Sequence, residues 1–161
     1  MHCRTRIAAS IGVVTLLTIA AACGSDRTSD GPQSSVAASG DLTPDAAGTV
    51  ALQMEDIKFD TTTLTVHSGQ TVNFRFTNTG MVTHDAFIGD AAAQTEHDAE
   101  MAATAGMPGM SGHSGDEPAV TVEPGESATL TYTFDTPGTY EIGCHQPGHY
   151  AAGMKVTVKV D

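Results

Sequence analysis

From Thr49 to the C-terminus, hydrophobic residues alternate with polar ones in short runs, as expected for strands with one buried face. Turn-forming pairs such as Ser68-Gly69 and Pro137-Gly138 separate the runs. Short strands joined by such turns indicate an all-β fold, an antiparallel Greek-key sandwich or barrel. The pattern predicts strands over residues 50–54, 59–66, 72–77, 82–88, 119–122, 130–134, 140–142 and 154–160.

One segment departs from this alternation. Residues 91–105 are rich in Ala and Glu and contain no run of β-branched residues, which favours a short helix. Asp90 is placed to cap its first turn. A loop rich in Gly and Met follows over residues 106–115, and we expect this whole insert to lie outside the barrel.

The first 23 residues are typical of an export signal. Arg4 and Arg6 precede an apolar run, residues 7–22, which is short for a membrane span. The run ends Ile19-Ala20-Ala21-Ala22-Cys23, which resembles the lipobox of bacterial lipoproteins and implies cleavage before Cys23 and a lipid on it. The protein would then be anchored to the cell membrane, facing the periplasm or the exterior. The alternative is ordinary secretory cleavage nearby, with Cys23 removed or free.

Composition separates a linker from a folded domain and limits the partners. Residues 24–47 are rich in Ser, Asp, Gly and Ala and predict a flexible linker, which leaves residues 48–161 as the domain. The net charge is -12, and removal of Arg4 and Arg6 leaves 5 basic residues against 19 acidic ones, or -14. This charge argues against nucleic acid as a partner and leaves room for docking to a protein with a basic surface. We expect a monomer.

The candidate chemistry lies between residues 144 and 154. Cys144, His149 and Met154 follow one another at intervals of five, and Pro147-Gly148 bends the chain between the first two. Cys144 is the one Cys of the predicted domain, and an unpaired thiol in an exported protein is a liability unless a metal occupies it. A thiolate, an imidazole and a thioether together suit copper better than zinc, calcium or magnesium. A structural Cys beside a surface His is the alternative, which three donors at this spacing disfavour.

A second imidazole should come from another strand. The candidates are His67, His84, His97, His113 and His145. We choose His84 because it lies near the end of a predicted strand. His145 adjoins Cys144 and should point away from the metal, and His67 is expected in a solvated turn.

The spacing Cys-x4-His-x4-Met, with Pro-Gly before the His, resembles the ligand loop of cupredoxins, the small blue-copper proteins. The resemblance covers roughly residues 49–161 and includes Thr83-His84-Asp85 and Val122-Glu123-Pro124-Gly125-Glu126. It implies one type 1 copper ion and an electron exit through the imidazole of the Cys loop. The implied ligands are His84, Cys144, His149 and Met154. This chain departs from the family where Asp85 stands in place of a frequent Asn, and where Val156 stands in place of a frequent Gly.

The helical insert offers a second, labile copper site for cuprous ions, which soft thioether ligands select. His97 and Met101 are four residues apart and would share a helix face. The other candidate ligands of this second site are Met107, Met110 and His113. Alternatively, the methionines only pack against the barrel mouth. The neighbouring acidic residues are expected to form a solvated face; they are Glu96, Asp98, Glu100, Asp116 and Glu117.

Two functions follow from these expectations. The first is electron transfer by one copper ion cycling between Cu(I) and Cu(II), with a redox protein as partner. The alternative is copper homeostasis, in which the chain buffers copper or delivers it to a trafficking partner. An enzyme would need further copper centres with His-x-His motifs, and the sequence contains none. We therefore predict that the protein is not an enzyme.

Overall fold

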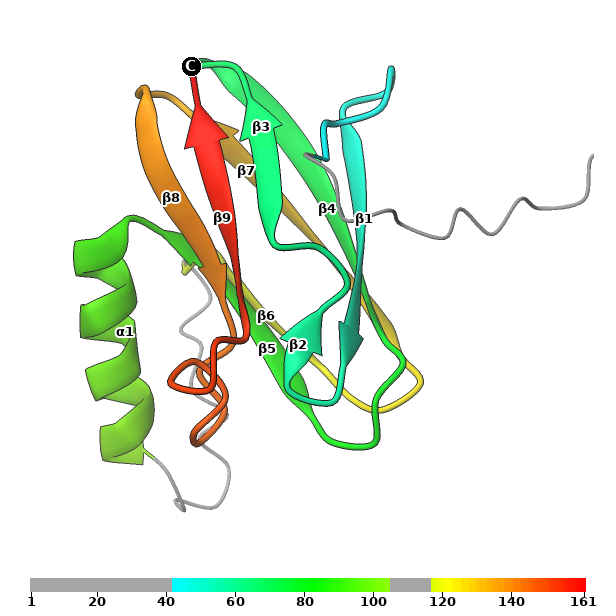
Figure 1. Cartoon of the computed structure of the whole chain (residues 1–161), viewed down its shortest axis with the longest axis vertical. Helices are drawn as coiled ribbons and strands as arrows, with labels where there is room; N and C mark the ends of the chain where they lie inside the picture. Colours follow the sequence, from blue (N-terminus) through cyan, green and yellow to red (C-terminus); the bar gives the residue numbers. More distant parts are fainter. Residues whose placement is uncertain (1–41, 105–116) are drawn as a thin grey trace, which may run out of the picture. The chain divides into compact units, whose positions relative to one another are not determined.

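Two β-sheets pack face to face in the part of the chain that the structure, a computed structural model, describes: residues 42–104 and 117–161 (Figure 1). The predicted leader and most of the linker lie outside this part, and so do Cys23, Met107, Met110 and His113.

The sheets have four and five strands. The four-stranded sheet runs in the order β2 (Lys58–Phe59), β1 (Thr49–Glu55), β4 (Gln70–Asn78), β7 (Ser127–Phe134). The five-stranded sheet runs in the order β3 (Thr63–Val66), β9 (Lys155–Val160), β8 (Gly138–Gly143), β5 (His84–Gly89), β6 (Ala119–Val122).

The predicted sandwich is confirmed, but its strand pairing is not wholly antiparallel. β1 pairs with β4 in parallel, and β3 pairs with β9 in parallel. The single strand predicted over residues 59–66 is wrong, because the chain leaves the first sheet after Phe59 and enters the second at Thr63. β2 and β3 therefore belong to different sheets.

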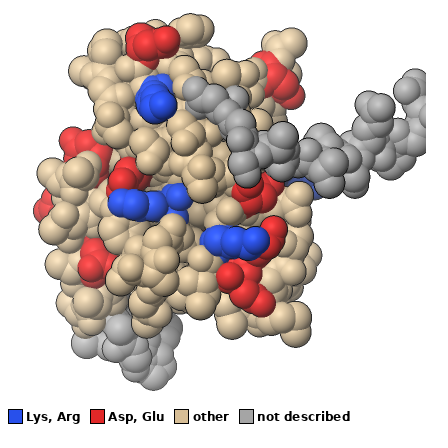
Figure 2. Space-filling model, in the orientation of Figure 1, with Lys and Arg blue, Asp and Glu red and all other residues tan. Residues whose placement is uncertain are grey.

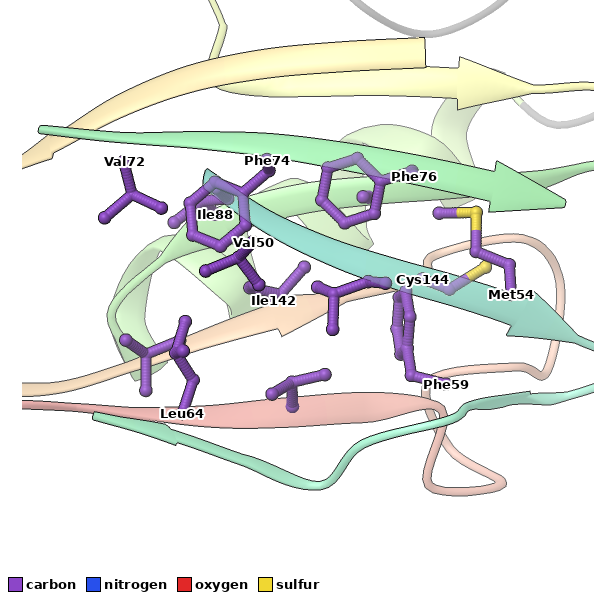
Figure 3. Close-up of a cluster of buried hydrophobic side chains, with 14 of the residues drawn as sticks. Val50, Met54, Phe59, Leu64, Val72, Phe74, Phe76, Ile88, Ile142 and Cys144 are labelled. Carbon is purple, nitrogen blue, oxygen red and sulfur yellow. The ribbon is translucent and has the colours of Figure 1, made fainter. Parts of the chain in front are cut away.

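The core lies between the sheets and is filled by the alternate residues that the sequence pattern selects. Phe74 and Phe76 of β4 stack with ring centroids 5.9 Å apart, and Phe134 meets Phe74 edge-on at 6.3 Å. Each side chain of this size stabilises the fold by about 1.5–3 kcal/mol when it is fully buried. Figure 3 shows Cys144 within this cluster, on the side of Met54 and Phe59.

The predicted helix is confirmed as α1 (Ala91–Thr104), which lies against the outer face of the five-stranded sheet (Figure 1). Asp90 caps it: Oδ1 accepts hydrogen bonds from the backbone N–H of Ala92 at 3.1 Å and of Ala93 at 2.9 Å. All six residues of β5 are buried, because one face lines the core and the other lies under α1 and the Cys loop. Among the described residues, no helix is long and apolar enough to cross a membrane.

Candidate metal centre

The Cys loop is held at both ends by strands. Cys144 follows β8 and is fully buried on the same side as Ile142, as the alternation predicts. Its backbone N–H donates to the carbonyl of Met154 at 3.1 Å, and the N–H of Met154 donates to the carbonyl of His149 at 3.0 Å. Gly148 has φ +84, a conformation that residues with a Cβ rarely adopt, so the bend before His149 favours glycine. The loop therefore positions its three donors before any metal binds.

The structure brings His84, the upstream imidazole, to this loop. Its Nδ1 lies 3.7 Å from the Sγ of Cys144, and the Nδ1 of His149 lies 3.4 Å from the same sulfur. The ligand atoms of the three residues all lie within 4.8 Å of one another. Met154, the residue before β9, is fully buried, and its backbone is hydrogen-bonded to those of Cys144 and His149, so its thioether is the fourth donor of the set.

These separations fit a bound metal ion. With metal–sulfur bonds of about 2.3 Å and metal–nitrogen bonds of about 2.0 Å, ligands about 110–120° apart are separated by about 3.5–3.7 Å. Two imidazoles and a thiolate with a thioether as fourth donor are the ligand set of type 1 copper. The residues present therefore fit a type 1 copper ion held by His84, Cys144, His149 and Met154.

Burial sets the protonation of the metal-free site. Desolvation raises the pKa of the Cys144 thiol, and the carboxylate of Asp85 raises it further. Desolvation also lowers the pKa of His84, and the neighbouring His149 lowers it again. The metal-free site thus favours a neutral thiol and a neutral His84 imidazole. Because a thiolate is the ligand form, copper binding releases the proton of Cys144.

His145 points away from the metal, as predicted, and is buried against α1. Its Nε2 donates to Oε1 of Gln94 at 2.7 Å, and its Nδ1 lies 3.1 Å from Oδ1 of Asp98. Its ring stacks on Tyr150 with centroids 4.5 Å apart. The residue after Cys144 therefore fastens the Cys loop to the helix.

Asp85 braces the loop from the strand that carries His84. Its Oδ1 accepts a hydrogen bond from the backbone N–H of His145 at 2.6 Å. The departure from the frequent Asn at this position therefore keeps the brace and adds a negative charge near Cys144.

Gln94 is the functional residue that the sequence reasoning missed. It is buried, and its Nε2 donates to the carbonyl of Glu141 in β8 at 2.8 Å while its Oε1 accepts from His145. Asp98, predicted as part of a solvated face, also contacts His145. A Gln and an Asp four residues apart in an Ala-rich helix are the signal that could have pointed to a polar, inward-facing side of α1.

The remaining histidines and the insert are placed as follows. His67 is exposed, as predicted, with its Nδ1 2.7 Å from Oδ1 of Asp161. His97 is buried on the side of α1 that faces Phe87 of β5, whereas Met101 is half-buried and lines a hollow of about 370 Å³ with Asp98 and Pro147. His97 and Met101 both belong to α1, four residues apart as predicted. The soft copper site predicted for them stays a prediction, because its other candidate ligands lie outside the described residues.

The comparisons with known proteins agree with this site. Residues 46–161 match the model of the family described as copper binding proteins, plastocyanin/azurin family. The chain therefore belongs to this cupredoxin family of copper-binding proteins.

Two kinds of relative are found within it. The chain is 38% identical over 117 residues to the copper-resistant cuproprotein CopI of Rubrivivax gelatinosus. This match covers 71% of this chain and 68% of the relative. It is 33% identical over 105 residues to auracyanin-A of Chloroflexus aurantiacus, covering 60% and 63%. The solved structure of reduced auracyanin from Roseiflexus castenholzii is similar, with a TM-score of 0.61 and 33% identity, covering 71% of this chain and 97% of that one.

Proposed function

We propose that this protein binds one copper ion in its type 1 centre outside the cytoplasm and serves in copper tolerance. The observation that carries the proposal is the group formed by the buried His84 and Cys144 and the part-buried His149, whose donor atoms are already at ligand-to-ligand distances. The likeness to CopI proteins, named copper-resistant, supports the tolerance role. The protein acts by holding copper rather than as an enzyme.

Electron transfer is the second candidate function, and the likeness to auracyanins, one of which is a "blue" copper protein, favours it. Strands hold both ends of the Cys loop, so copper could change oxidation state with little movement of its ligands. His149, on the loop and only part-buried, would be the exit for the electron. A redox protein would then be the partner.

The copper site is tested by anaerobic titration with Cu(I) and Cu(II), read by absorption and metal content. We expect one copper per chain at this site and an intense thiolate-to-copper absorption band. Cys144→Ser should abolish the band because the sulfur ligand is gone. The matched control His67→Gln changes an exposed His and should leave the band intact. An unchanged spectrum in Cys144→Ser would contradict the assignment of Cys144 as a copper ligand.

A deletion experiment, in cells that no longer make this protein, distinguishes the two functions. If the role is copper tolerance, deletion lowers survival in copper and the wild-type chain restores it, whereas Cys144→Ser does not. If the role is electron carriage, deletion leaves copper survival unchanged, and the purified copper protein exchanges electrons reversibly with a redox partner.

We also propose a lipid anchor at Cys23 and, as partner, a redox or copper-trafficking protein with a basic docking surface. Acidic side chains outnumber basic ones in the chain, and Figure 2 shows the two kinds interspersed over one face of the described residues. A labelled fatty acid should enter the wild-type chain but not Cys23→Ala, and that variant should leave the membrane fraction. Label in both chains would contradict the anchor.

A further inference from the structure

A second group of metal-ligating side chains lies on the opposite face of β5 from His84. It consists of His97 and Glu100 of α1 and of Glu117, which precedes β6. One ligand atom from each, an imidazole nitrogen and two carboxylate oxygens, lie within 4.8 Å of one another. Two residues one helical turn apart and a third from another element thus converge on one point.

The elements around this group fix its geometry. The ring of His97 is 2% exposed and stacks on Phe87 with centroids 4.0 Å apart and planes 5° apart. The ring of His145 also meets it edge-on at 5.0 Å, and this ring lies 6.1 Å from that of Phe87. Two ring neighbours, Phe87 and His145, therefore hold the orientation of this imidazole.

The backbone that carries Glu117 is also held. The N–H of Ala119 donates to the carbonyl of Glu117 at 2.8 Å, and the N–H of Ile88 donates to the carbonyl of Pro118 at 2.9 Å. The carboxylate therefore comes from a segment tied to β5, while Gln94 ties α1 to β8. Ligands on braced elements lose little freedom when they bind a metal.

The three side chains open into a hollow of about 230 Å³, which Phe87, Glu96 and Pro118 also line. Water can thus reach the point where the three donors meet and supply the remaining ligands of an ion. One imidazole and two carboxylates contain no sulfur, so they suit divalent ions such as Cu²⁺ and Zn²⁺ rather than Cu⁺.

We propose that His97, Glu100 and Glu117 form a second metal site that binds one divalent transition-metal ion. Among divalent ions, nitrogen and oxygen ligands bind Cu²⁺ most tightly. This differs from the soft cuprous site that the methionines of the insert suggested, because the described donors are an imidazole and carboxylates. The site does not depend on the role of the type 1 copper.

The test uses the full-length protein with its type 1 centre already filled, as shown by a constant absorption band. Cu²⁺ is then titrated and followed by calorimetry and electron paramagnetic resonance. We expect one further equivalent per chain, with a spectrum typical of nitrogen and oxygen ligands and without a new thiolate band. Absence of a saturable second equivalent would overturn the proposal.

Paired variants identify the ligands. Glu100→Gln with Glu117→Gln should weaken the second equivalent by about tenfold or more, by analogy with the losses seen when partners of metal ligands are removed. The control Glu126→Gln with Asp135→Asn removes two exposed charges elsewhere and should leave the affinity unchanged. An intact type 1 band shows that each variant is folded. Equal weakening in both pairs would indicate general attraction to an acidic surface, and full affinity in the first pair would exclude these ligands; either overturns the proposal.

Discussion

Two consecutive residues, Cys144 and His145, connect the copper centre to the rest of the molecule. Successive side chains at a strand end point to opposite faces, so the thiol enters the core while the imidazole packs under α1. The brace from Asp85 holds the peptide between them. The ligand sulfur is therefore positioned by contacts on both faces of the sheet.

At this scale, the stability of the metal-free protein should fall on both sides of neutral pH. The pKa of His84 lies below its ordinary value of 6.5, so below that pH the unfolded chain binds more protons and stability falls as the pH drops. The pKa of Cys144 lies above its ordinary value of 9.0, so above that pH the folded chain keeps a proton that the unfolded chain loses. Stability then falls as the pH rises.

Urea unfolding of the metal-free protein from about pH 5 to 10 measures both arms, across the ordinary pKa values of His and Cys. Cys144→Ser should remove part of the alkaline loss and leave the acid arm unchanged. An alkaline loss of equal size in the variant would contradict the assignment to Cys144.

The charge of Asp85 should tune the copper potential. Asp85→Asn keeps an acceptor for the N–H of His145 but removes a negative charge near the thiolate. Loss of this charge favours Cu(I) over Cu(II). We expect the reduction potential to rise by tens of millivolts, where about 59 mV is a tenfold change in a one-electron equilibrium. A spectroelectrochemical titration measures it. The exposed Asp135→Asn serves as control, and an equal rise there would contradict a local effect.

Among the elements, β5 and α1 determine the surroundings of the Cys loop. β5 supplies His84 to the core face and Asp85 to the loop, and α1 covers the outer face with Gln94 and Asp98 directed at His145. The helical insert is thus part of the support of the metal centre.

Removing the side chain of Gln94 should loosen this support. Gln94→Ala removes the donor to the carbonyl of Glu141 and the acceptor for the Nε2 of His145, which costs about 1–3 kcal/mol in unfolding free energy. Denaturant unfolding measures the loss. Thr95→Ala, on the exposed side of the same helix, should stay within about 0.5 kcal/mol. Equal changes in the two variants would show that the buried hydrogen bonds of Gln94 contribute no stability.

Local pattern sufficed for most strands, the helix and its Asp90 cap, because alternation and capping depend on neighbours in sequence. It also found the copper ligands: Cys144, His149 and Met154 share one loop, and His84 lies near the end of a predicted strand. It could not show that Phe59 and Leu64 enter different sheets, since both fit the same alternation. Nor could it show that Gln94 meets His145, a contact between segments about 50 residues apart that only tertiary packing decides.

At the scale of the whole molecule, the paired strands β8 and β9 of the sandwich hold both ends of the copper loop. β8 and β9 pair antiparallel from Gly138 with Val160 to Gly143 with Lys155, so both ends of the loop leave one rigid ladder. The aromatic cluster of Phe74, Phe76 and Phe134 fills the core between the sheets.

Weakening that core should lower stability without altering the metal centre. Phe74→Ala should cost about 3–5 kcal/mol in unfolding free energy, whereas the copper absorption of the folded fraction should keep its position. Phe74→Leu is a milder variant that should lie between it and the wild type. A shift of the absorption band in Phe74→Leu would show that the core sets the ligand geometry directly.

The parallel pairing of β3 with β9 bears on when copper binds. It joins Leu64 to Val158, and the ligands His84 and Cys144 are themselves 60 residues apart. Contacts so distant in sequence form late and slowly in folding, on the scale of milliseconds to seconds in β-proteins. We expect the donor set to assemble only after the last strand is seated, so that a folded, metal-free protein captures copper and the metal does not direct folding.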